Sequence, residues 1–294
     1  MASGDGFVWC SGGHRHWGTN GAAGLLLVDS ECRVLLQHRA SWTHQGSTWA
    51  LPGGAIHDGE SPRAAAIREA GEEAAVPPDA VRVTAATAVD HGGWRYTTIL
   101  ATARETVRER VMNAESTELR WVSPEEVGNF PLHQDFAAAW PALHAQLGRE
   151  LVLVVDAANV VGSRPDGWWR DRAGAAARLR DSLGALVRDG VRGTDVALAP
   201  DWCWWPTVRL VVEGQARRIS SGDGAGGGTG GTVEVVAAER DGDSAIVEVV
   251  RASAPREQVV VVTADRELRS RVEAEGASVV GPGTLLGLLE VTER

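Results

Sequence analysis

The sequence contains no lysine, so all 29 of its basic residues are arginine, and it has only three cysteines. Cys10, Cys32 and Cys203 stand far apart without a CxxC spacing, which excludes a zinc ribbon and favours isolated thiols in a reducing compartment. No run of eighteen apolar residues is present, and the first residues lack the basic-then-apolar profile of a secretion signal. These absences argue against a membrane partner and predict a cytoplasmic protein.

Positive charge is also scarce, because 29 basic residues face 39 acidic ones and leave a net charge of −10. A surface that binds nucleic acid without sequence preference needs concentrated positive charge to neutralise phosphates. The composition argues against that class of protein. A local group of arginines could still bind a small anionic substrate.

The length of 294 residues, with 44% hydrophobic residues, is more than one ordinary domain needs. The pattern of the sequence changes near Glu150, where a continuous apolar strand begins. We therefore predict two domains, covering residues 1–148 and 149–294. The sequence makes no prediction about oligomeric state.

The first domain is predicted to be an α+β sandwich with an α/β/α arrangement. After a loose leader over residues 1–20, the apolar runs Ala23–Val28 and Arg33–His38 predict a β-hairpin. Ser61-Pro62 is a helix start, and Pro77-Pro78 ends that helix. Further strands are expected at 81–89, 96–103 and 119–122, and helices near Pro124–Val127 and at 133–147.

The second domain is predicted to be a three-layer α/β domain with a mainly parallel sheet. The run Leu151–Val155 is apolar throughout, which is typical of a strand buried on both faces of a parallel sheet. Helical and strand-like segments then intermingle, at 173–187, 195–199, 208–212, 233–236, 243–250, 259–262, 265–275 and 278–280. The glycine-dense stretch Gly222–Gly231 lacks the Lys-Ser/Thr of a phosphate-binding loop and is expected to be a flexible connection.

The most informative residues lie on the helix that follows Ser61. Glu69, Glu72 and Glu73 stand at positions i, i+3 and i+4, so their side chains share one helix face. Three clustered carboxylates repel one another, and a divalent cation would remove that conflict, since Mg²⁺ prefers hard oxygen ligands. The alternative is a solvated acidic face, which is common in soluble proteins.

The surrounding pattern resembles the Nudix box. In that motif a glycine is followed after five residues by Glu, then after seven more by Arg-Glu, and then by Glu-Glu. These positions are occupied here by Gly54, Glu60, Arg68, Glu69, Glu72 and Glu73. Val76 matches the closing aliphatic position, and Trp49-Ala-Leu-Pro-Gly-Gly54 is similar to the usual lead-in. The resemblance covers about residues 18–147 and implies a hydrolase that cleaves the diphosphate of a small nucleotide-like substrate.

The resemblance also implies a metal site for Mg²⁺ or Mn²⁺. The implied ligands, all glutamates, are Glu69, Glu72, Glu73 and Glu115. Glu118 competes with Glu115 for the last position, where relatives have a further metal-binding or general-base glutamate. The metal would neutralise the diphosphate and lower the pKa of a water that a glutamate orients.

Other residues of the motif are implied to support this chemistry. Arg68 would orient the catalytic Glu69 through charge-assisted hydrogen bonds, and Glu60 would brace the joint between loop and helix. Gly53 could lend its carbonyl to the metal, and Gly53 and Gly54 would contribute to substrate binding. Trp49, in a loop with Trp42 and His44, could stack on a base or serve packing, and both uses remain open.

One position departs from the family pattern. Ala75 stands where the family usually has glycine, which accommodates a left-handed backbone at the helix end. A non-glycine residue in that conformation costs roughly 1 kcal/mol. The following prolines could instead end the helix differently, so we expect at most a modest loss of stability.

The second domain carries acidic residues at the ends of its predicted strands. Asp156 follows a buried strand, and Asp265 follows Val259–Val262 in the same way. Asp243, with Asp241 nearby, would begin a helix between them. Open α/β sheets place their sites at such strand ends, and several carboxylates could form one metal site. Equally, Asp156 and Asp265 could simply cap the helices that follow.

The segment from Val154 to Pro165, together with Val261–Arg269, resembles the NYN branch of PIN-like ribonuclease domains over about residues 150–290. The acidic catalytic site that this implies consists of Asp156, Asn159, Asp243 and Asp265, with Asn159 on the substrate-binding side. Those domains often have two adjacent acids where this chain has Asp243-Ser244, so one carboxylate is missing. RNA is thus a possible partner of the second domain.

The leading hypothesis is a Mg²⁺-dependent Nudix pyrophosphohydrolase that cleaves a nucleoside diphosphate derivative or a nucleoside triphosphate. Oxidised nucleoside triphosphates, nucleotide sugars and ADP-ribose all remain candidate substrates. The alternatives are a metal-dependent ribonuclease acting through the second domain, and a nucleotide-sensing regulatory protein whose Nudix pocket does not hydrolyse. A pocket that only binds anionic phosphates would gain little from so many glutamates.

Overall fold

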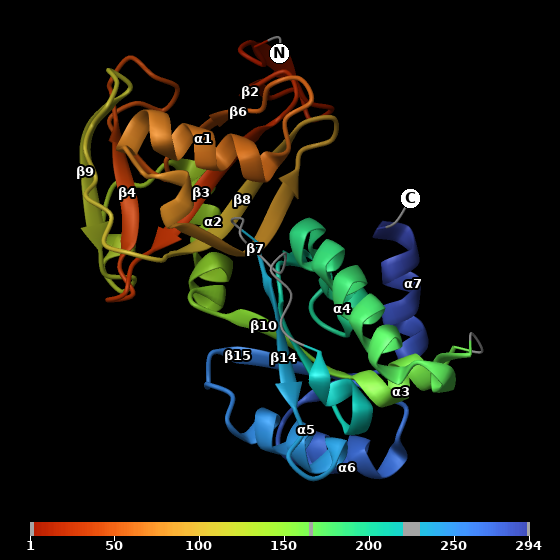
Figure 1. Ribbon diagram of the computed structural model, residues 1–294. Helices are drawn as coiled ribbons and strands as arrows, with labels where there is room; N and C mark the ends of the chain where they lie inside the picture. The colour runs from red at the N-terminus through yellow and green to blue at the C-terminus, as the bar shows by residue number, and fades with distance from the viewer. Residues whose placement is uncertain (1–2, 165–166, 220–229, 293–294) are drawn as a thin grey trace. The chain divides into compact units, whose positions relative to one another are not determined.

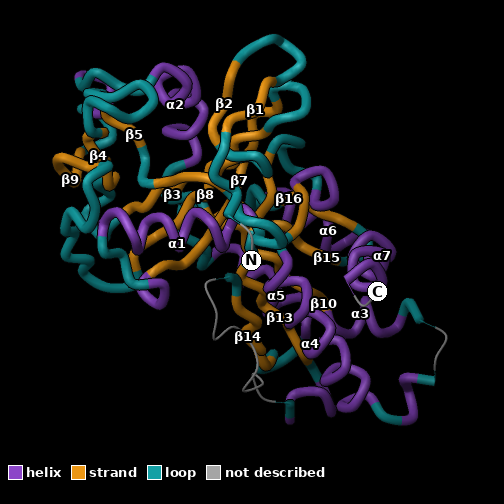
Figure 2. The backbone as a smooth tube through the Cα atoms, turned by 90° about the horizontal axis from the view of Figure 1, so that it is seen from above, coloured by secondary structure: helices purple, strands orange, loops and turns teal. Residues whose placement is uncertain are grey.

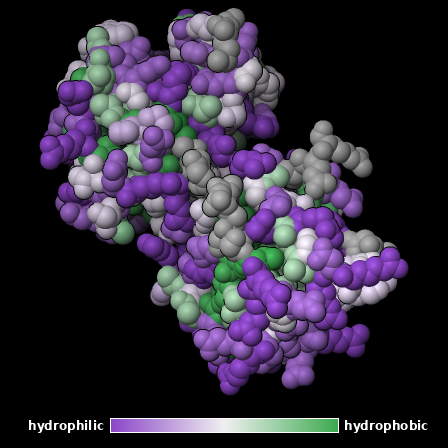
Figure 3. Space-filling view, viewed as in Figure 1, coloured by the Kyte–Doolittle hydropathy of each residue, from purple (hydrophilic) through white to green (hydrophobic). Residues whose placement is uncertain are grey.

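The computed structural model describes residues 3–164, 167–219 and 230–292. The chain forms two compact units, Met1–Gly148 (unit 1) and Arg149–Arg294 (unit 2), shown in Figure 1. Residues 222–229 of the glycine-dense stretch, expected to be a flexible connection, lie outside the described residues. No helix in the described ranges is long and apolar enough to cross a membrane. Hydrophilic side chains cover most of the face seen in Figure 3.

The N-terminal residues form a small hairpin, so the prediction of a loose leader is wrong. Strands β1 (Phe7–Trp9) and β2 (Arg15–Trp17) pair antiparallel. His16 of β2 stacks on Trp94 with ring centroids 4.1 Å apart. This aromatic contact packs the hairpin against the rest of unit 1. Strands of three residues are too short to show the alternation by which a sequence reveals a strand.

A mixed sheet forms the centre of unit 1. Five strands follow the order β7-β8-β3-β4-β5, while β6 pairs with β3 and β9 with β4. Only β3 and β8 run parallel among the described pairs of this sheet. The strand bounds are β3 (Ala22–Val28), β4 (Val34–Arg39), β5 (Trp49–Ala50), β6 (Gly53–Ala55), β7 (Val81–Asp90), β8 (Arg95–Ala103) and β9 (Ser116–Val122). All seven residues of β3 are buried, so this strand lies at the core.

Two helices lie on opposite sides of this sheet, α1 (Pro62–Ala74) and α2 (Gln134–Gln146) (Figure 2). This is the expected α/β/α arrangement. Short 3₁₀ turns at η1 (Pro78–Ala80) and η2 (Val127–Asn129) complete the unit. The helix expected near Pro124–Val127 is reduced to a turn followed by η2.

Both ends of α1 follow from local chemistry. The side chain of Ser61 accepts a hydrogen bond from the Ala64 N–H at 3.2 Å, and Pro62 occupies the first helical position. Ala75 ends the helix with φ 58° and ψ 28°, in the left-handed region. Its N–H donates to the Gly71 carbonyl at 3.2 Å. The prolines that follow do not end the helix in another way, so Ala75 adopts a strained left-handed conformation.

Unit 2 contains a five-stranded parallel sheet in the order β14-β13-β10-β15-β16. The predicted second α/β domain with a parallel sheet is therefore present. Its strands are β10 (Glu150–Asp156), β13 (Thr207–Val212), β14 (Thr232–Ala237), β15 (Glu257–Val262) and β16 (Ser278–Val280). The central strand β10 is buried at every position, which explains its uninterrupted apolar sequence.

Helices cover this parallel sheet as two groups (Figure 1). Helices α5 (Gly242–Arg251) and α6 (Arg266–Ala274) pack together on one side. The other group is α3 (Ala157–Gly162), α4 (Arg172–Asp189) and α7 (Pro282–Thr292). Smaller elements of unit 2 are η3 (Trp168–Arg170), η4 (Gly193–Val196), η5 (Gly214–Arg218) and the β11 (Val191–Arg192) and β12 (Trp202–Trp204) hairpin. The carboxyl ends of β10, β13 and β15 lie side by side because the strands are parallel neighbours.

Candidate active site

The three glutamates of α1 differ strongly in exposure. Glu73 is 1% exposed, the side chain of Glu69 is 15% exposed, and that of Glu72 is 58% exposed. Burial raises the pKa of Glu69 above its ordinary value, and the neighbouring charges of Glu72 and Glu115 raise it further. The shared helix face therefore runs from the protein interior to solvent.

Arg68 lies at the centre of this group. Its Nε and Nη2 atoms donate to the two carboxylate oxygens of Glu60, at 2.9 and 3.0 Å. Its Nη1 atom donates to Glu69 Oε1 at 2.8 Å and to Glu72 Oε2 at 3.2 Å. The hydrogen bonds to Arg68 lower the pKa of Glu60. One guanidinium thus joins the loop before α1 to two glutamates of the helix.

Glu73 is buried against the sheet, and each of its oxygens accepts one hydrogen bond. Gln37 Nε2 donates to Oε1 at 3.2 Å, and the Gly53 N–H donates to Oε2 at 2.8 Å. Burial nevertheless dominates and raises the pKa of Glu73 to about 7. A buried carboxyl of this kind is costly for folding, which is typical of a functional group.

The glycine pair before the helix permits a close approach of backbone to the site. A Cβ on Gly53 would lie 2.4 Å from the Ala23 carbonyl oxygen, and one on Gly54 would lie 2.5 Å from Glu69 Oε1. Neither position therefore tolerates a side chain without movement. The structure shows Gly53 binding Glu73 through its N–H, a contact that the sequence did not predict.

Glu115 and Glu118, the two candidates for the last acidic position, lie in different surroundings. The charge of Glu115 acts on Glu69, and its backbone carbonyl accepts a hydrogen bond from the Ala40 N–H at 2.8 Å. Glu118 is paired instead with Arg120 at an exposed position. The electrostatic influence of Glu115 on Glu69 and the pairing of Glu118 with Arg120 therefore favour Glu115 as the member of the glutamate group.

The surroundings of Trp49 favour packing, one of the two uses that the sequence left open, over the substrate contact proposed for it. Only 6% of Trp49 is exposed, and its ring meets Phe130 edge-on with centroids 5.2 Å apart. Its ring is also near His38, at 5.1 Å. A base could not stack on a side chain so enclosed. Trp42, which is 67% exposed, is the tryptophan of this loop that a ligand could reach.

Several residues beside the glutamates were missed from the sequence. Arg39 ends β4, and its positive charge acts to lower the pKa of both Glu73 and Tyr96. Tyr96 is the single tyrosine of the chain, and burial raises its pKa to about 12, so it remains a neutral phenol. Gln37 and Ser116 form a buried polar pair, with the Ser116 hydroxyl 3.3 Å from Gln37 Oε1. The one sequence signal was a glutamine within the apolar run of β4.

Comparison with known proteins agrees with this geometry. The NUDIX domain model matches residues 18–145. "Putative 8-oxo-dGTP diphosphatase 3" of Mycobacterium tuberculosis is 49% identical over 150 residues, covering 48% of this chain and 69% of the relative. The chain belongs to the Nudix family. As a Nudix hydrolase, it acts on phosphorus-containing anhydrides.

Two further relatives share the Nudix part of the chain. A nucleoside triphosphate pyrophosphatase/Nudix hydrolase fusion protein of Bifidobacterium longum is 42% identical over 152 residues, covering 49% of this chain and 32% of that protein. The crystal structure of the Nudix hydrolase RenU from M. smegmatis is 47% identical and covers 48% of this chain and 94% of its own, with a TM-score of 0.45. Unit 2 lies outside the residues that the Nudix model matches.

The donor chemistry of the Nudix helix suits Mg²⁺ or Mn²⁺, because the glutamates offer only carboxylate oxygens. Within the described residues, no three His, Cys, Asp or Glu side chains converge closely enough to hold an ion. Arg68 draws the carboxylates of Glu69 and Glu72 onto its guanidinium instead. Metal binding would therefore exchange hydrogen bonds to Arg68 for bonds to the cation.

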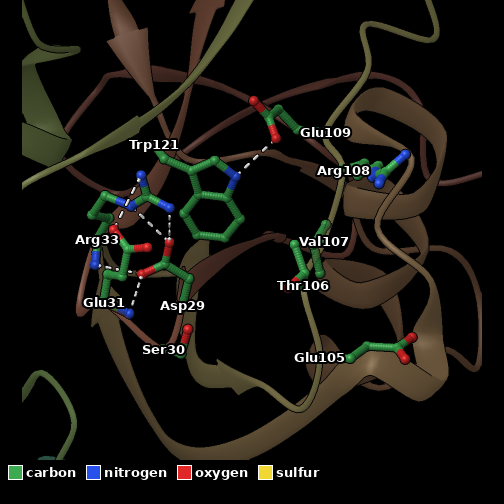
Figure 4. A pocket seen from close by; sticks show the side chains of 10 residues that line it. All are labelled: Asp29, Ser30, Glu31, Arg33, Glu105, Thr106, Val107, Arg108, Glu109 and Trp121. Carbon is green, nitrogen blue, oxygen red and sulfur yellow. Dashed lines mark hydrogen bonds and ion pairs between the residues drawn. The ribbon is translucent and has the colours of Figure 1, made fainter.

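A cavity of about 510 Å³ elsewhere in the Nudix unit does not contain these glutamates (Figure 4). Its walls are the β3–β4 turn, the loop after β8 and Trp121. The indole N–H of Trp121 donates to Glu109 Oε2 at 2.9 Å, and Asp29 pairs with Arg33 at 2.7 Å. These polar groups therefore satisfy one another. We do not assign the cavity to catalysis.

In unit 2, a cavity of about 250 Å³ collects the acidic residues that the sequence predicted. Its lining includes Asp156, Asn159, Asp243, Asp265 and also Glu213. Burial raises the pKa of Asp156, and the charge of Asp243 raises it further. Glu213, which follows β13, was missed by the sequence analysis because no motif marks it.

Capping accounts for part of this acidic group. Asp156 Oδ1 accepts from the Asn159 N–H at 3.0 Å and so caps α3, while Asp265 Oδ1 accepts from the Leu268 N–H at 2.8 Å and caps α6. Asp156 Oδ2 also accepts from the Thr263 hydroxyl at 3.0 Å. Asp243 caps nothing, since Asp241 is the N-cap of α5. Asp156 and Asp265 thus cap helices and also line the cavity.

Proposed function

We propose that unit 1 is a Mg²⁺- or Mn²⁺-dependent pyrophosphohydrolase that cleaves the diphosphate linkage of a nucleoside triphosphate or a nucleoside diphosphate derivative. The observation that carries this proposal is the group of glutamates braced by Arg68, with Glu73 buried and its pKa raised to about 7. Acidic residues kept at such cost on one helix face suit a cation-dependent site.

Oxidised purine nucleoside triphosphates are the first substrates to test, because the name of the mycobacterial relative refers to 8-oxo-dGTP. Its 49% identity over the Nudix part makes a related substrate class reasonable. Arg39 is the side chain we assign to the phosphates. It lies at the end of β4 within electrostatic reach of Glu73 and Tyr96.

The metal would be held by Glu69, Glu72, Glu73 and Glu115, and when bound it would neutralise the diphosphate and acidify a coordinated water. The protein side chains do the remaining work. Arg68 fixes Glu69 while it is not bound to a cation. A glutamate of this group accepts the proton of the attacking water, and we assign that role to Glu69 or Glu115.

A panel of substrates with Mg²⁺ tests the proposal. Release of phosphate, diphosphate or nucleotide would be measured for 8-oxo-dGTP, unmodified nucleoside triphosphates, a nucleotide sugar and ADP-ribose. Glu73→Gln should lose most turnover while the fold remains intact. Glu118→Gln removes an exposed acid outside the group and should retain wild-type rates. Wild-type turnover by Glu73→Gln would contradict the assignment.

A second candidate function belongs to unit 2, where we propose a metal-dependent phosphodiesterase acting on RNA. The specific observation is Glu213, which joins Asp156, Asp243 and Asp265 around one cavity and supplies a carboxylate that the sequence had seemed to lack. Its Oε2 accepts from the Gly242 N–H at 2.8 Å, which holds it beside Asp243.

The full chain carrying Glu73→Gln, which silences unit 1, provides the background for testing unit 2. Single-stranded RNA and Mn²⁺ should yield cleavage products, and Asp243→Asn should abolish them. Asp243 is the suitable position because it caps no helix. Intact RNA with the Glu73→Gln chain would remove this second candidate without affecting the first.

A further inference from the structure

A glutamine lies in the buried part of strand β4 in unit 1. Gln37 on β4 is 0% exposed, as are its strand neighbours Val34, Leu35 and Leu36. A buried amide is costly unless both of its ends are hydrogen-bonded. Both ends of Gln37 are: Nε2 donates to Glu73 Oε1 at 3.2 Å, and Oε1 accepts from the Ser116 hydroxyl at 3.3 Å.

The hydrogen-bond chain runs from the Ser116 hydroxyl through Gln37 to Glu73. The NH₂ end of Gln37 faces Glu73, which is the orientation that the ionised carboxylate requires, because an ionised carboxylate only accepts hydrogen bonds. The Ser116 hydroxyl, 4% exposed, donates to the amide oxygen of Gln37. With the Gly53 N–H on its other oxygen, the carboxylate of Glu73 is held on both sides.

The same chain reaches the backbone that carries Glu115. Ser116 is the first residue of β9 and follows Glu115 directly. The Ala40 N–H donates to the Glu115 carbonyl at 2.8 Å, next to a register shift between His38 and Arg39. Gln37 thus links Glu73 on α1 to Ser116, the residue that directly follows Glu115.

We infer that Gln37 and Ser116 are positioning residues, which hold Glu73 and the Glu115 backbone in the arrangement that binds the divalent cation. This inference rests on the proposed function of unit 1. In this role both side chains act through Glu73 and the backbone next to Glu115, and not by contact with substrate or cation. Partners that orient metal ligands through hydrogen bonds typically change metal affinity or activity by about 10–100-fold when removed.

The competing interpretation is a polar pair that serves only the stability of the core. Both interpretations predict a lower melting temperature when the pair is broken, so stability cannot separate them. Metal affinity in the absence of substrate separates them, because a core pair without a positioning role would leave that affinity unchanged.

The experiment compares Gln37→Met and Ser116→Ala with the wild-type full chain. The dissociation constant for Mn²⁺ is measured by electron paramagnetic resonance without nucleotide, and kcat and KM are measured with Mg²⁺. Each variant should bind Mn²⁺ about 10–100-fold more weakly and lose kcat with little change in KM. The double variant should lose no more than Gln37→Met alone, since both act through one chain.

Two further variants complete the design. Ser116→Thr keeps the hydroxyl and should retain metal affinity close to wild type. Gln146→Met is the matched control, because Gln146 Oε1 is a buried amide oxygen in the same unit without a hydrogen-bond partner. It should change neither Mn²⁺ affinity nor kcat.

A wild-type Mn²⁺ dissociation constant and kcat in both Gln37→Met and Ser116→Ala would overturn the inference and leave the proposed function standing. Wild-type protein that neither binds Mn²⁺ nor hydrolyses any nucleotide would instead overturn the proposed function, and the positioning role with it. If Gln37→Met fails to fold, Ser116→Ala decides the matter, because it removes one hydroxyl only.

Discussion

Arg68 donates two parallel hydrogen bonds to Glu60, from Nε to Oε1 at 2.9 Å and from Nη2 to Oε2 at 3.0 Å. This fork-shaped contact requires the planar guanidinium and fixes its orientation. The remaining nitrogen, Nη1, is thereby directed at Glu69 and Glu72. Glu60, in the loop before α1, thus fixes the orientation of Arg68, and Arg68 in turn holds Glu69 and Glu72.

Arg68→Lys should therefore behave as a severe change although it conserves charge. A lysine offers one nitrogen and cannot hold Glu60 at both oxygens while also reaching Glu69. We expect kcat to fall by at least about 10-fold and the free energy of unfolding to fall by about 1–3 kcal/mol. Steady-state kinetics and urea denaturation measure both. Arg120→Lys, at an exposed ion pair, is the control, and equal losses in the two variants would contradict the assignment.

The buried carboxyl of Glu73 should make stability fall as pH rises. Its pKa is raised to about 7 in the folded protein, whereas an unfolded chain has the ordinary value near 4.5. Between these values the folded state keeps a proton that the unfolded state has lost, so the unfolding free energy decreases with increasing pH. The full loss, roughly 3 kcal/mol at most, is reached above pH 7.

Glu73→Gln removes this ionisation and should flatten the profile over that window. The unfolding free energies of both proteins are measured by urea denaturation from pH 4 to 8 with a chelator present. The variant should gain on the wild-type protein as pH rises. Profiles that run parallel over the whole range would show that Glu73 does not carry the raised pKa.

Ala75→Gly should stabilise unit 1 by about 1 kcal/mol, because Ala75 holds a left-handed backbone that glycine adopts without strain. Thermal and urea denaturation give the difference. Ala64→Gly, in the first turn of the same helix, is the matched control and should destabilise by up to about 1 kcal/mol. A loss of stability in Ala75→Gly would show that the helix end gains nothing from glycine.

Gly54→Ala should impair catalysis more than folding. The added Cβ would lie 2.5 Å from Glu69 Oε1, so the carboxylate must move away from Arg68. We expect kcat to fall about 10–100-fold, the range found when the orientation of a metal ligand is lost. Gly128→Ala, where a Cβ would meet no atom within 4 Å, is the control. Unchanged kcat in Gly54→Ala would show that the displaced glutamate is not needed.

The sequence was most informative where the physical cause is local. The start of α1 at Ser61-Pro62 and the shared face of its glutamates depend on residues within a few positions of one another, whereas the form of the helix end at Ala75 was left open. The parallel sheet of unit 2 was also predictable, because continuous apolar strands have few other uses. These features need no knowledge of distant contacts.

Features that depend on partners far along the chain were not predictable. Gln37 becomes informative only when the fold brings Glu73 and Ser116 to it. Glu213 follows a strand without any motif, and its place beside Asp243 depends on the order of strands in the sheet. The burial of Trp49 against Phe130 likewise depends on a loop distant in sequence, so its packing role was left open beforehand.

The enclosed Glu73–Gln37 contact has a consequence for protein engineering. Exchanging both members of a buried polar pair for apolar side chains of similar shape is often neutral or even favourable for folding. Glu73 and Gln37 also accept hydrogen bonds from the Gly53 N–H and the Ser116 hydroxyl, so a library screened solely for heat resistance should favour apolar replacements at both positions only where Ser116 is replaced as well. The heat-resistant variants selected in this way would lack catalytic activity. Any such screen of this protein should therefore measure product formation as well as the amount of folded protein.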